Sequence, residues 1–167
     1  LRYKYGMAVE EQSAGQRNKE PYNRFISMNF MICRDAFLKV RFDETFHLGY
    51  EDTLFGMQLE QAGVEILHID NPVYHLVEEN SEQFLMKIRR AVRNLDGHIE
   101  QMHSHVKLLR WYACVKCLGM APLVAFLFRQ IEKRLVSNLT SRKPSLKLFA
   151  FYKLGYLCNF LSQKKPD

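Results

Sequence analysis

The sequence is poor in cysteine and in long apolar runs, and both shortages exclude classes of protein. Its 167 residues include four cysteines, too few and too scattered for the disulfide framework of a small secreted domain. The uncharged stretch Cys117–Phe128 has twelve residues and is interrupted by Gly119 and Pro122, whereas a membrane-spanning helix needs about 20 apolar residues. We therefore expect neither a disulfide scaffold nor a membrane span, and a reducing, cytoplasmic location is the simpler one.

The chain also lacks an initiating methionine and a recognisable signal peptide. It begins with Leu1, so we expect a longer parent protein. No cationic stretch followed by an apolar run and a small-residue cleavage site opens these residues. The apolar share of 47% and the charged share of 25% place the chain among globular proteins.

Acidic residues are scarce in the C-terminal part of the chain. From Val106 onward, twelve Lys or Arg residues stand against Glu132 and Asp167, a net charge of +10, whereas the first 105 residues carry a net charge of −4. One part is mildly acidic and the other strongly basic. We therefore expect the two parts to meet different partners.

The hydrophobic pattern predicts strands and helices in alternation. Phe25–Cys33 is a nearly continuous apolar run of strand length, typical of a strand buried on both faces. Val64–His68 is predicted to form a second, short strand, and residues 1–24 to form a loop or an irregular extended segment. Helices are predicted over Arg34–Val40, over Tyr50–Ala62 before Gly63, from an N-cap at Ser81 to about Leu95, and over Pro144–Ser162.

The chemically informative feature is an acidic pair, Glu51 and Asp52, at the predicted start of a helix. Taken alone, acidic residues in a first helical turn are explained by the helix dipole, which stabilises them by about 0.3–1 kcal/mol. Their surroundings favour a functional role. An apolar strand containing Asn29, a short helix, Phe42-Asp43-Glu44 and a glycine precede the pair, and a helix, a short strand and His75 follow it.

This order resembles the C-terminal half of the GT-A domain in family 2 glycosyltransferases. The likeness covers about residues 1 to 95, is closest to bacterial members that build surface polysaccharides, and is carried by four stretches: Ser27–Arg34, Arg41–Glu44, Gly49–Thr53 and Ile69–His75. The resemblance implies an α/β fold. Residues 1–98 would form the acceptor-side half of a GT-A (nucleotide-diphospho-sugar transferase) domain, and residues 99–167 a basic helical extension.

The resemblance also implies a reaction. Family members transfer a sugar from a nucleotide-sugar donor to a saccharide or lipid-linked acceptor, and we expect inversion at the sugar. Inverting transfer needs a base near the attacking hydroxyl group. By similarity Asp52 is this base, Glu51 orients the acceptor or holds the loop, and Asn29, Gly49 and Tyr50 bind substrate.

A divalent cation belongs to the same expectation. In the family, Mn2+ or Mg2+ held by an Asp-x-Asp motif stabilises the departing nucleoside diphosphate, and a downstream histidine adds a ligand at a position that His75 matches. The alternative for His75 is a turn histidine with a satisfied hydrogen bond. No Asp-x-Asp occurs in these residues, so we expect the donor-binding elements upstream of Leu1 and no activity from this chain alone.

The remaining motifs leave alternatives open. Cys114 and Cys117, with His103 and His105, offer four zinc ligands, but their place in a helix-like run favours buried free cysteines. The basic C-terminal part fits nucleic acid, a plain helical subdomain or an anionic membrane surface, and we favour the inner face of the plasma membrane. The main rival to an enzyme is a non-catalytic membrane- or nucleic-acid-binding module whose acidic pair only starts a helix.

Overall fold

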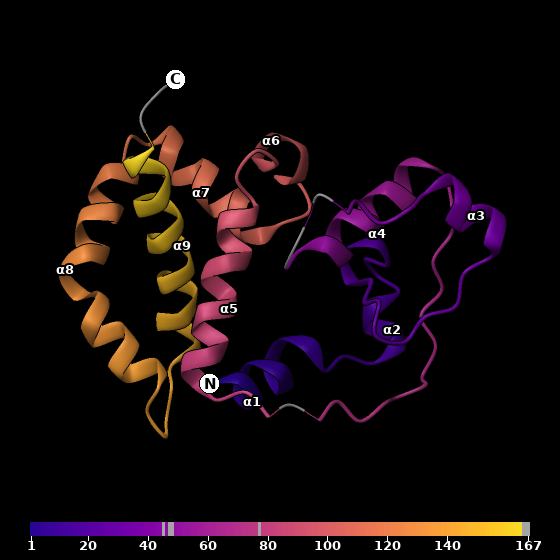
Figure 1. Ribbon diagram of the computed structural model, residues 1–167, viewed down its shortest axis with the longest axis horizontal. Helices are drawn as coiled ribbons and strands as arrows, with labels where there is room; N and C mark the ends of the chain where they lie inside the picture. The colour runs from indigo at the N-terminus through magenta and orange to yellow at the C-terminus, as the bar shows by residue number, and fades with distance from the viewer. Residues whose placement is uncertain (45, 47–48, 77, 165–167) are drawn as a thin grey trace. The chain divides into compact units, whose positions relative to one another are not determined.

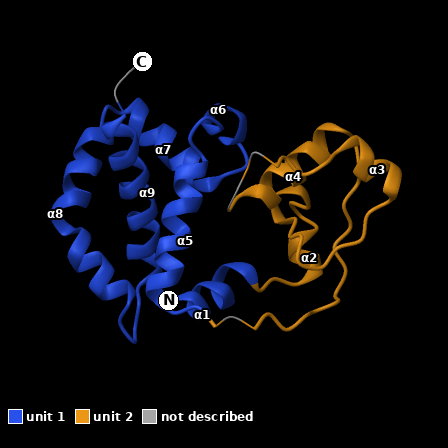
Figure 2. Ribbon diagram, viewed as in Figure 1, with its two compact units in different colours: residues 1–10, 79–167 blue, residues 11–78 orange. Residues whose placement is uncertain are grey.

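The computed structural model describes residues 1–44, 46, 49–76 and 78–164, and every regular element among them is helical (Figure 1). The chain forms two compact units, coloured separately in Figure 2. The helical unit joins Leu1–Glu10 to Glu79–Asp167, and the acidic-pair unit comprises Glu11–Glu78.

The helical unit is built on α8 (Ala121–Leu139) and α9 (Leu146–Gln163), which lie side by side (Figure 1). A glycine of α9 allows the close approach, because a Cβ at Gly155 would lie 2.6 Å from the ring of Phe128. Against α9 pack α5 (Ser81–Asn94) and α7 (Lys107–Cys117), joined through the short α6 (Ile99–Met102).

One guanidinium group ties three of these helices together. Arg89 of α5 donates from Nε to the Tyr152 hydroxyl group at 2.5 Å and from Nη2 to Oε1 of Glu132 at 2.6 Å. Tyr152 belongs to α9 and is fully buried, and Glu132 belongs to α8. The polar ends of buried aromatic side chains thus find partners inside the helical unit.

The first ten residues also belong to the helical unit, as α1 (Arg2–Tyr5) and the π-helical turn η1 (Gly6–Glu10). The prediction of a loop there was wrong because tertiary contacts hold the segment. The Leu1 amino group donates to the Ser81 hydroxyl oxygen at 3.0 Å, and Lys4 Nζ donates to the Pro144 carbonyl oxygen at 2.9 Å.

The acidic-pair unit packs around Phe55 of α4 (Glu51–Gln61). The ring of Phe42 stacks on that of Phe55 with centroids 4.1 Å apart, and Phe25, Phe30 and Phe37 surround them. The remaining elements are α2 (Ala14–Arg17), the 3-10 turn η2 (Tyr22–Arg24) and α3 (Arg34–Lys39).

The predicted α/β fold, a partial GT-A domain, is wrong for the described residues, which contain no strand. Phe25–Cys33 is not buried on both faces, since the side chains of Met28 and Met31 are exposed. A strand needs a neighbouring strand to pair its backbone amide and carbonyl groups. The apolar run has none among the described residues, and its phenylalanines pack on α4 instead.

The second predicted strand, Val64–His68, is an extended segment that a side chain supports. The Asn18 side chain accepts a hydrogen bond from the His68 amide and donates one to the His68 carbonyl oxygen, both at 2.8 Å. It satisfies both backbone groups of His68, as a neighbouring strand would. The ring of His68 has a structural contact as well, because its Nε2 lies 3.0 Å from the Pro21 carbonyl oxygen.

The longer predicted helices are confirmed with small changes at their ends. The helix α5 is capped by Asn80 and not by Ser81, through a capping box in which Asn80 and Gln83 bond each other's backbone amides. It packs with the C-terminal helices, so the compact units divide the chain near residues 10 and 78. The functional division proposed near residue 98 stays a prediction.

Candidate functional site

The backbone enters α4 through two consecutive left-handed residues. Gly49 has a φ of 76° and Tyr50, the N-cap of α4, has a φ of 71°. Glycine adopts this conformation freely, whereas another residue loses about 1–2 kcal/mol. Strain of this kind persists only where the surrounding structure maintains it, and it clusters at functional sites. The left-handed turn at Gly49 and Tyr50 places Glu51 and Asp52 in the first turn of α4.

The two acidic side chains keep unused acceptor capacity at this helix start. Asp52 Oδ2 accepts a hydrogen bond from the Ser27 amide at 3.2 Å. Asp52 Oδ1 and Glu51 Oε2 are buried and have no hydrogen-bond partner among the described residues. An unsatisfied buried polar atom costs about 1–3 kcal/mol, so each instance calls for an explanation. A group that binds substrate or takes up a proton is such an explanation.

Asn29 lies two residues after the amide that holds Asp52. It is exposed, and its Nδ2 donates to the Asn71 carbonyl oxygen at 3.1 Å. Asp70 in turn accepts from the Ala14 amide at 2.9 Å, which fixes the segment beside Asn29 to the start of α2. The structure therefore links Asn29 to the acidic pair through one short turn.

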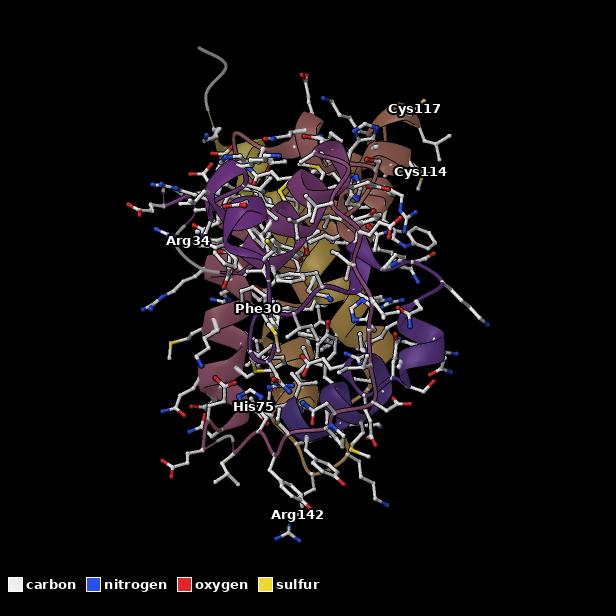
Figure 3. All side chains as sticks on the ribbon, turned by 90° about the vertical axis from the view of Figure 1, so that its right-hand side faces the viewer. Phe30, Arg34, His75, Cys114, Cys117 and Arg142 are labelled. Atoms are coloured by element: carbon white, nitrogen blue, oxygen red, sulfur yellow. The ribbon has the colours of Figure 1, made fainter. Side chains whose placement is uncertain are left out.

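His75 is exposed on the extended segment that follows Asn71, where Figure 3 labels it. Its neighbours Tyr74 and Leu76 are 100% and 88% exposed. Within residues 1–44, 46, 49–76 and 78–164, no hydrogen bond or ion pair of His75 is found, to the acidic pair or to any other group. The satisfied turn histidine is therefore wrong, and the role of metal ligand stays a prediction.

The described residues do not form a metal site by themselves. No group of three or more His, Cys, Asp or Glu side chains gathers among them, whereas Mg2+ demands six ligands in near-octahedral geometry. His75 is the single ligand that the sequence proposes here.

One contributor to the site was not singled out from the sequence. Ser27 orients the Asp52 carboxylate through its backbone amide, and every residue except proline carries that group. Only its place in the stretch Ser27–Arg34 hinted at a role. No spacing or residue type identifies a backbone donor, so tertiary structure was needed to find it.

The pair Cys114 and Cys117 is not buried as the sequence predicts. Cys114 and Cys117 are exposed on the outside of α7 (Figure 3), so the expectation of buried cysteines is wrong for both. Cys158 is buried, and burial raises the pKa of its thiol to about 11. The zinc alternative gains no support, since no cluster of three ligands occurs in the described part of the chain.

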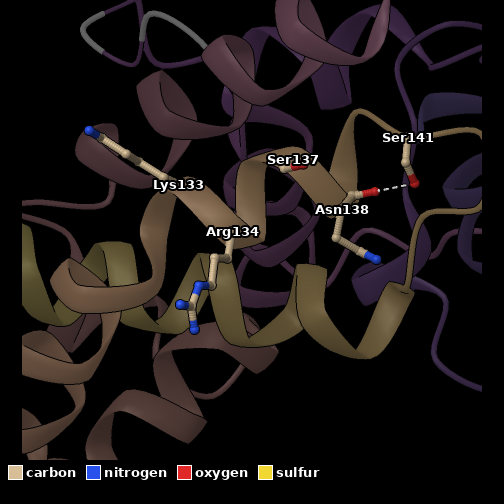
Figure 4. A pocket seen from close by; sticks show the side chains of 5 residues that line it. All are labelled: Lys133, Arg134, Ser137, Asn138 and Ser141. Carbon is tan, nitrogen blue, oxygen red and sulfur yellow. Dashed lines mark hydrogen bonds between the residues drawn. The ribbon is translucent and has the colours of Figure 1, made fainter.

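A shallow depression lies on α8 and the connection that follows it. Figure 4 shows Lys133 and Arg134 extending from the helix, with Ser137, Asn138 and Ser141 further along. The Ser141 hydroxyl group donates to the Asn138 carbonyl oxygen at 2.7 Å. The depression is an open cationic surface and lies in the helical unit, whereas the acidic pair lies in the other unit.

Comparisons with protein-family models, with curated proteins and with solved structures find no match to this chain. No family is shown for this chain, and the resemblance described above depends only on the order of the motifs around the acidic pair.

Proposed function

We propose that the chain carries the acceptor-activating part of a sugar transferase that uses a nucleotide-sugar donor and resembles family 2 glycosyltransferases. The acceptor is a saccharide or a lipid-linked acceptor in the synthesis of a cell-surface polysaccharide. The acidic pair supports this proposal most directly, because buried carboxylate oxygens of Glu51 and Asp52 have no hydrogen-bond partner among the described residues. The ordered stretches around the pair, from Asn29 to His75, support it independently.

In the proposed reaction Asp52 is the base. The acceptor hydroxyl oxygen attacks the anomeric carbon of the donor as the bond to the nucleoside diphosphate breaks, and the configuration of the sugar inverts. The hydroxyl proton passes to Asp52 Oδ1, the oxygen without a partner. The Ser27 amide holds Oδ2 at 3.2 Å and so orients the other oxygen. Glu51 accepts a hydrogen bond from a second acceptor hydroxyl group and positions the acceptor.

A divalent cation, Mn2+ or Mg2+, remains part of the proposal by family resemblance. When bound, it would stabilise the negative charge of the departing nucleoside diphosphate, and His75 is the residue of this chain proposed to ligate it. The roles proposed for Glu51 and Asp52 are separate from that of the cation. These two residues hold the acceptor and remove its proton.

The proposed role of Asp52 is tested by Asp52→Asn in the full-length parent protein, because the donor-binding elements are expected outside these residues. The amide side chain has nearly the same shape and its oxygen still accepts from the Ser27 amide, so the fold is kept. It does not take up a proton at neutral pH. We expect kcat, measured as acceptor-dependent release of nucleoside diphosphate, to fall by about 10²–10⁴-fold.

The matched control is Asp35→Asn. Asp35 also lies in the first turn of a helix of the same unit, but its side chain is exposed. Its variant should keep full turnover. If Asp52→Asn also turned over at the normal rate, the pair would only start α4, and the non-catalytic module would be the better proposal.

A further inference from the structure

An apolar surface is exposed where α7 turns into α8. Five side chains between 43% and 66% exposed form it, and we call them the apolar tip: Leu118, Met120, Leu123, Phe126 and Leu127. Contiguous exposed apolar residues of this kind mark sites that meet a partner or a membrane.

The exposed face of α8 changes character along the helix. Phe126 and Leu127 are followed seven residues later by Lys133 and Arg134, which are also exposed. Residues seven apart lie on the same helical face, about 10 Å apart along the axis. One continuous face therefore runs from apolar at the tip to cationic at the depression of Figure 4.

The exposed side chains of α7 also change from cationic to apolar towards the tip, here from the start of the helix to its end. Lys107 and Arg110 lie exposed in its first turns, and the chain reaches the tip at Leu118 after the last turn. Trp111 lies between these cations and Leu118 in the sequence and is 58% exposed. Cations therefore stand behind the apolar tip on both helices, although Lys116 and Arg129, which are also exposed, lie close to the tip.

The pair of helices suits partial insertion. Among the described residues, no single helix is long and apolar enough to span a membrane, whereas α7 and α8 together meet that requirement in composition but bend by 115° between them. A bent pair of this kind is compatible with a broken span or with a loop that dips into one face of a bilayer and returns, and the cations on both helices favour the loop. The cations behind the tip would then reach the level of the headgroups.

Charge argues for lipid and against a second copy of the chain on this surface. The sequence of α7 contains no acidic residue, and the one acid of α8, Glu132, is bonded to Arg89 at 2.6 Å. Two copies meeting at the tip would bring their cations together, which is unfavourable. Anionic headgroups would neutralise the same cations.

We infer that the bent pair of helices α7 and α8 is a membrane anchor that inserts its apolar tip into an anionic lipid surface. Lys107, Arg110, Lys133 and Arg134 contact headgroup phosphates, and Trp111 lies at the interface, where tryptophan is favoured. The anchor goes beyond the proposed sugar transfer and does not depend on it, because its residues all belong to the helical unit and the acidic pair to the other.

The test uses Trp111, the only tryptophan of the chain, as the probe. The full chain is titrated with vesicles of phosphatidylcholine containing phosphatidylglycerol, and separately with vesicles of phosphatidylcholine alone. We expect a blue shift of the Trp111 emission with the mixed vesicles, quenching by lipids brominated near the headgroup, and loss of binding at high salt.

Two double variants test the tip and the cations. Leu123→Gln with Phe126→Gln should lower the partition constant about 30-fold, since half of each side chain loses its apolar environment. Lys133→Gln with Arg134→Gln should lower it by a similar factor. The matched controls are Met86→Gln with Leu148→Gln, and Arg90→Gln with Lys147→Gln, which alter exposed residues of the same unit away from the tip. They should bind nearly normally.

Three results would overturn the anchor. In the first, the tip variant binds like the wild type while its far-ultraviolet circular dichroism stays helical. In the second, the charge control loses as much binding as the Lys133 and Arg134 variant, so that net charge alone governs it. In the third, no vesicle binds and sedimentation velocity shows a dimer that the tip variant abolishes, which would make a second copy the occupant.

Discussion

Lys153 of α9 is a cation held against two aromatic rings. Its Nζ lies 5.2 Å from the ring centroid of Tyr5 and 4.9 Å from that of Phe149. Burial, with a smaller contribution from the charge of Lys107, lowers the pKa of Lys153 to about 8. Cation–π contacts favour the charged amine, but the loss of water outweighs them here.

This pKa makes the stability of the helical unit depend on pH. Below about pH 8 the amine is protonated in both the folded and the unfolded chain. Between about 8 and the ordinary value of 10.5, only the unfolded chain keeps the proton, so the contribution of Lys153 to stability rises with pH. Lys153→Met removes the penalty of the buried charge. We expect the variant to be more stable than the wild type near neutral pH and the difference to shrink as pH approaches 10.5.

Urea denaturation followed by Trp111 fluorescence measures this difference, since Trp111 lies in the same unit. Comparing the wild type and the variant at each pH cancels the contribution that other titrating groups make to the pH dependence of stability. Cys158, whose pKa is raised to about 11, is one of these groups. A stability difference that stays constant from neutral pH to pH 10 would contradict the assignment.

The helix α4 carries the acidic pair and is held by a close backbone contact. A Cβ at Gly56 would lie 2.3 Å from the Tyr22 carbonyl oxygen of η2 and 3.2 Å from Cβ of Phe25. The Tyr22 oxygen is a backbone atom and does not yield as the end of a flexible side chain does. Glycine is therefore required for packing at Gly56, although it weakens the helix by about 1 kcal/mol relative to alanine.

Gly56→Ala should lower the free energy of unfolding of the acidic-pair unit by about 1–3 kcal/mol, because the clash exceeds the gain in helix propensity. Hydrogen exchange of the α4 amides measures this. Gly15→Ala is the control, since Gly15 lies in α2 with nothing within 4 Å of an added Cβ. It should leave exchange unchanged or slow it slightly. Equal effects of the two substitutions would refute the close contact.

The two units differ sharply in charge at the scale of the whole molecule. The helical unit has eighteen Lys or Arg residues and seven Asp or Glu residues, a net charge of +11. The acidic-pair unit has six basic and eleven acidic residues, a net charge of −5. Like charges repel within a compact unit and weaken it. The same excess of cations is what the proposed membrane anchor uses.

Salt should therefore stabilise the helical unit. Raising sodium chloride from about 20 mM to about 300 mM shortens the screening length several-fold, and we expect the free energy of unfolding, followed by Trp111 fluorescence, to rise by about 1 kcal/mol. Arg142→Gln with Lys143→Gln removes two exposed cations after α8. This variant should be more stable at low salt and gain less from added salt. A fall in stability with salt would mean that ion pairs such as Arg89–Glu132 dominate instead.

The sequence by itself determined the features that depend on near neighbours along the chain. The ends of α3, α4, α5 and α9 follow from apolar spacing, capping residues and glycine, which act over about four residues. The acidic pair at the start of α4 was predicted for the same reason. The order of motifs from Asn29 to His75, and the reaction inferred from it, also came from sequence alone and await the Asp52→Asn assay.

Only the tertiary structure decided which groups meet across the chain. The apolar run Phe25–Cys33 has the pattern of a buried strand, but a strand must pair with a partner from elsewhere in the chain. In the structure the aromatic rings of the run pack on Phe55 of α4 instead. Leu1–Glu10 became helical through contacts with Ser81 and Pro144. The Ser27 amide on Asp52 and the exposure of the α7–α8 tip are likewise non-local. Burial and hydrogen-bond partners are properties of the packed chain, and a local pattern does not specify them.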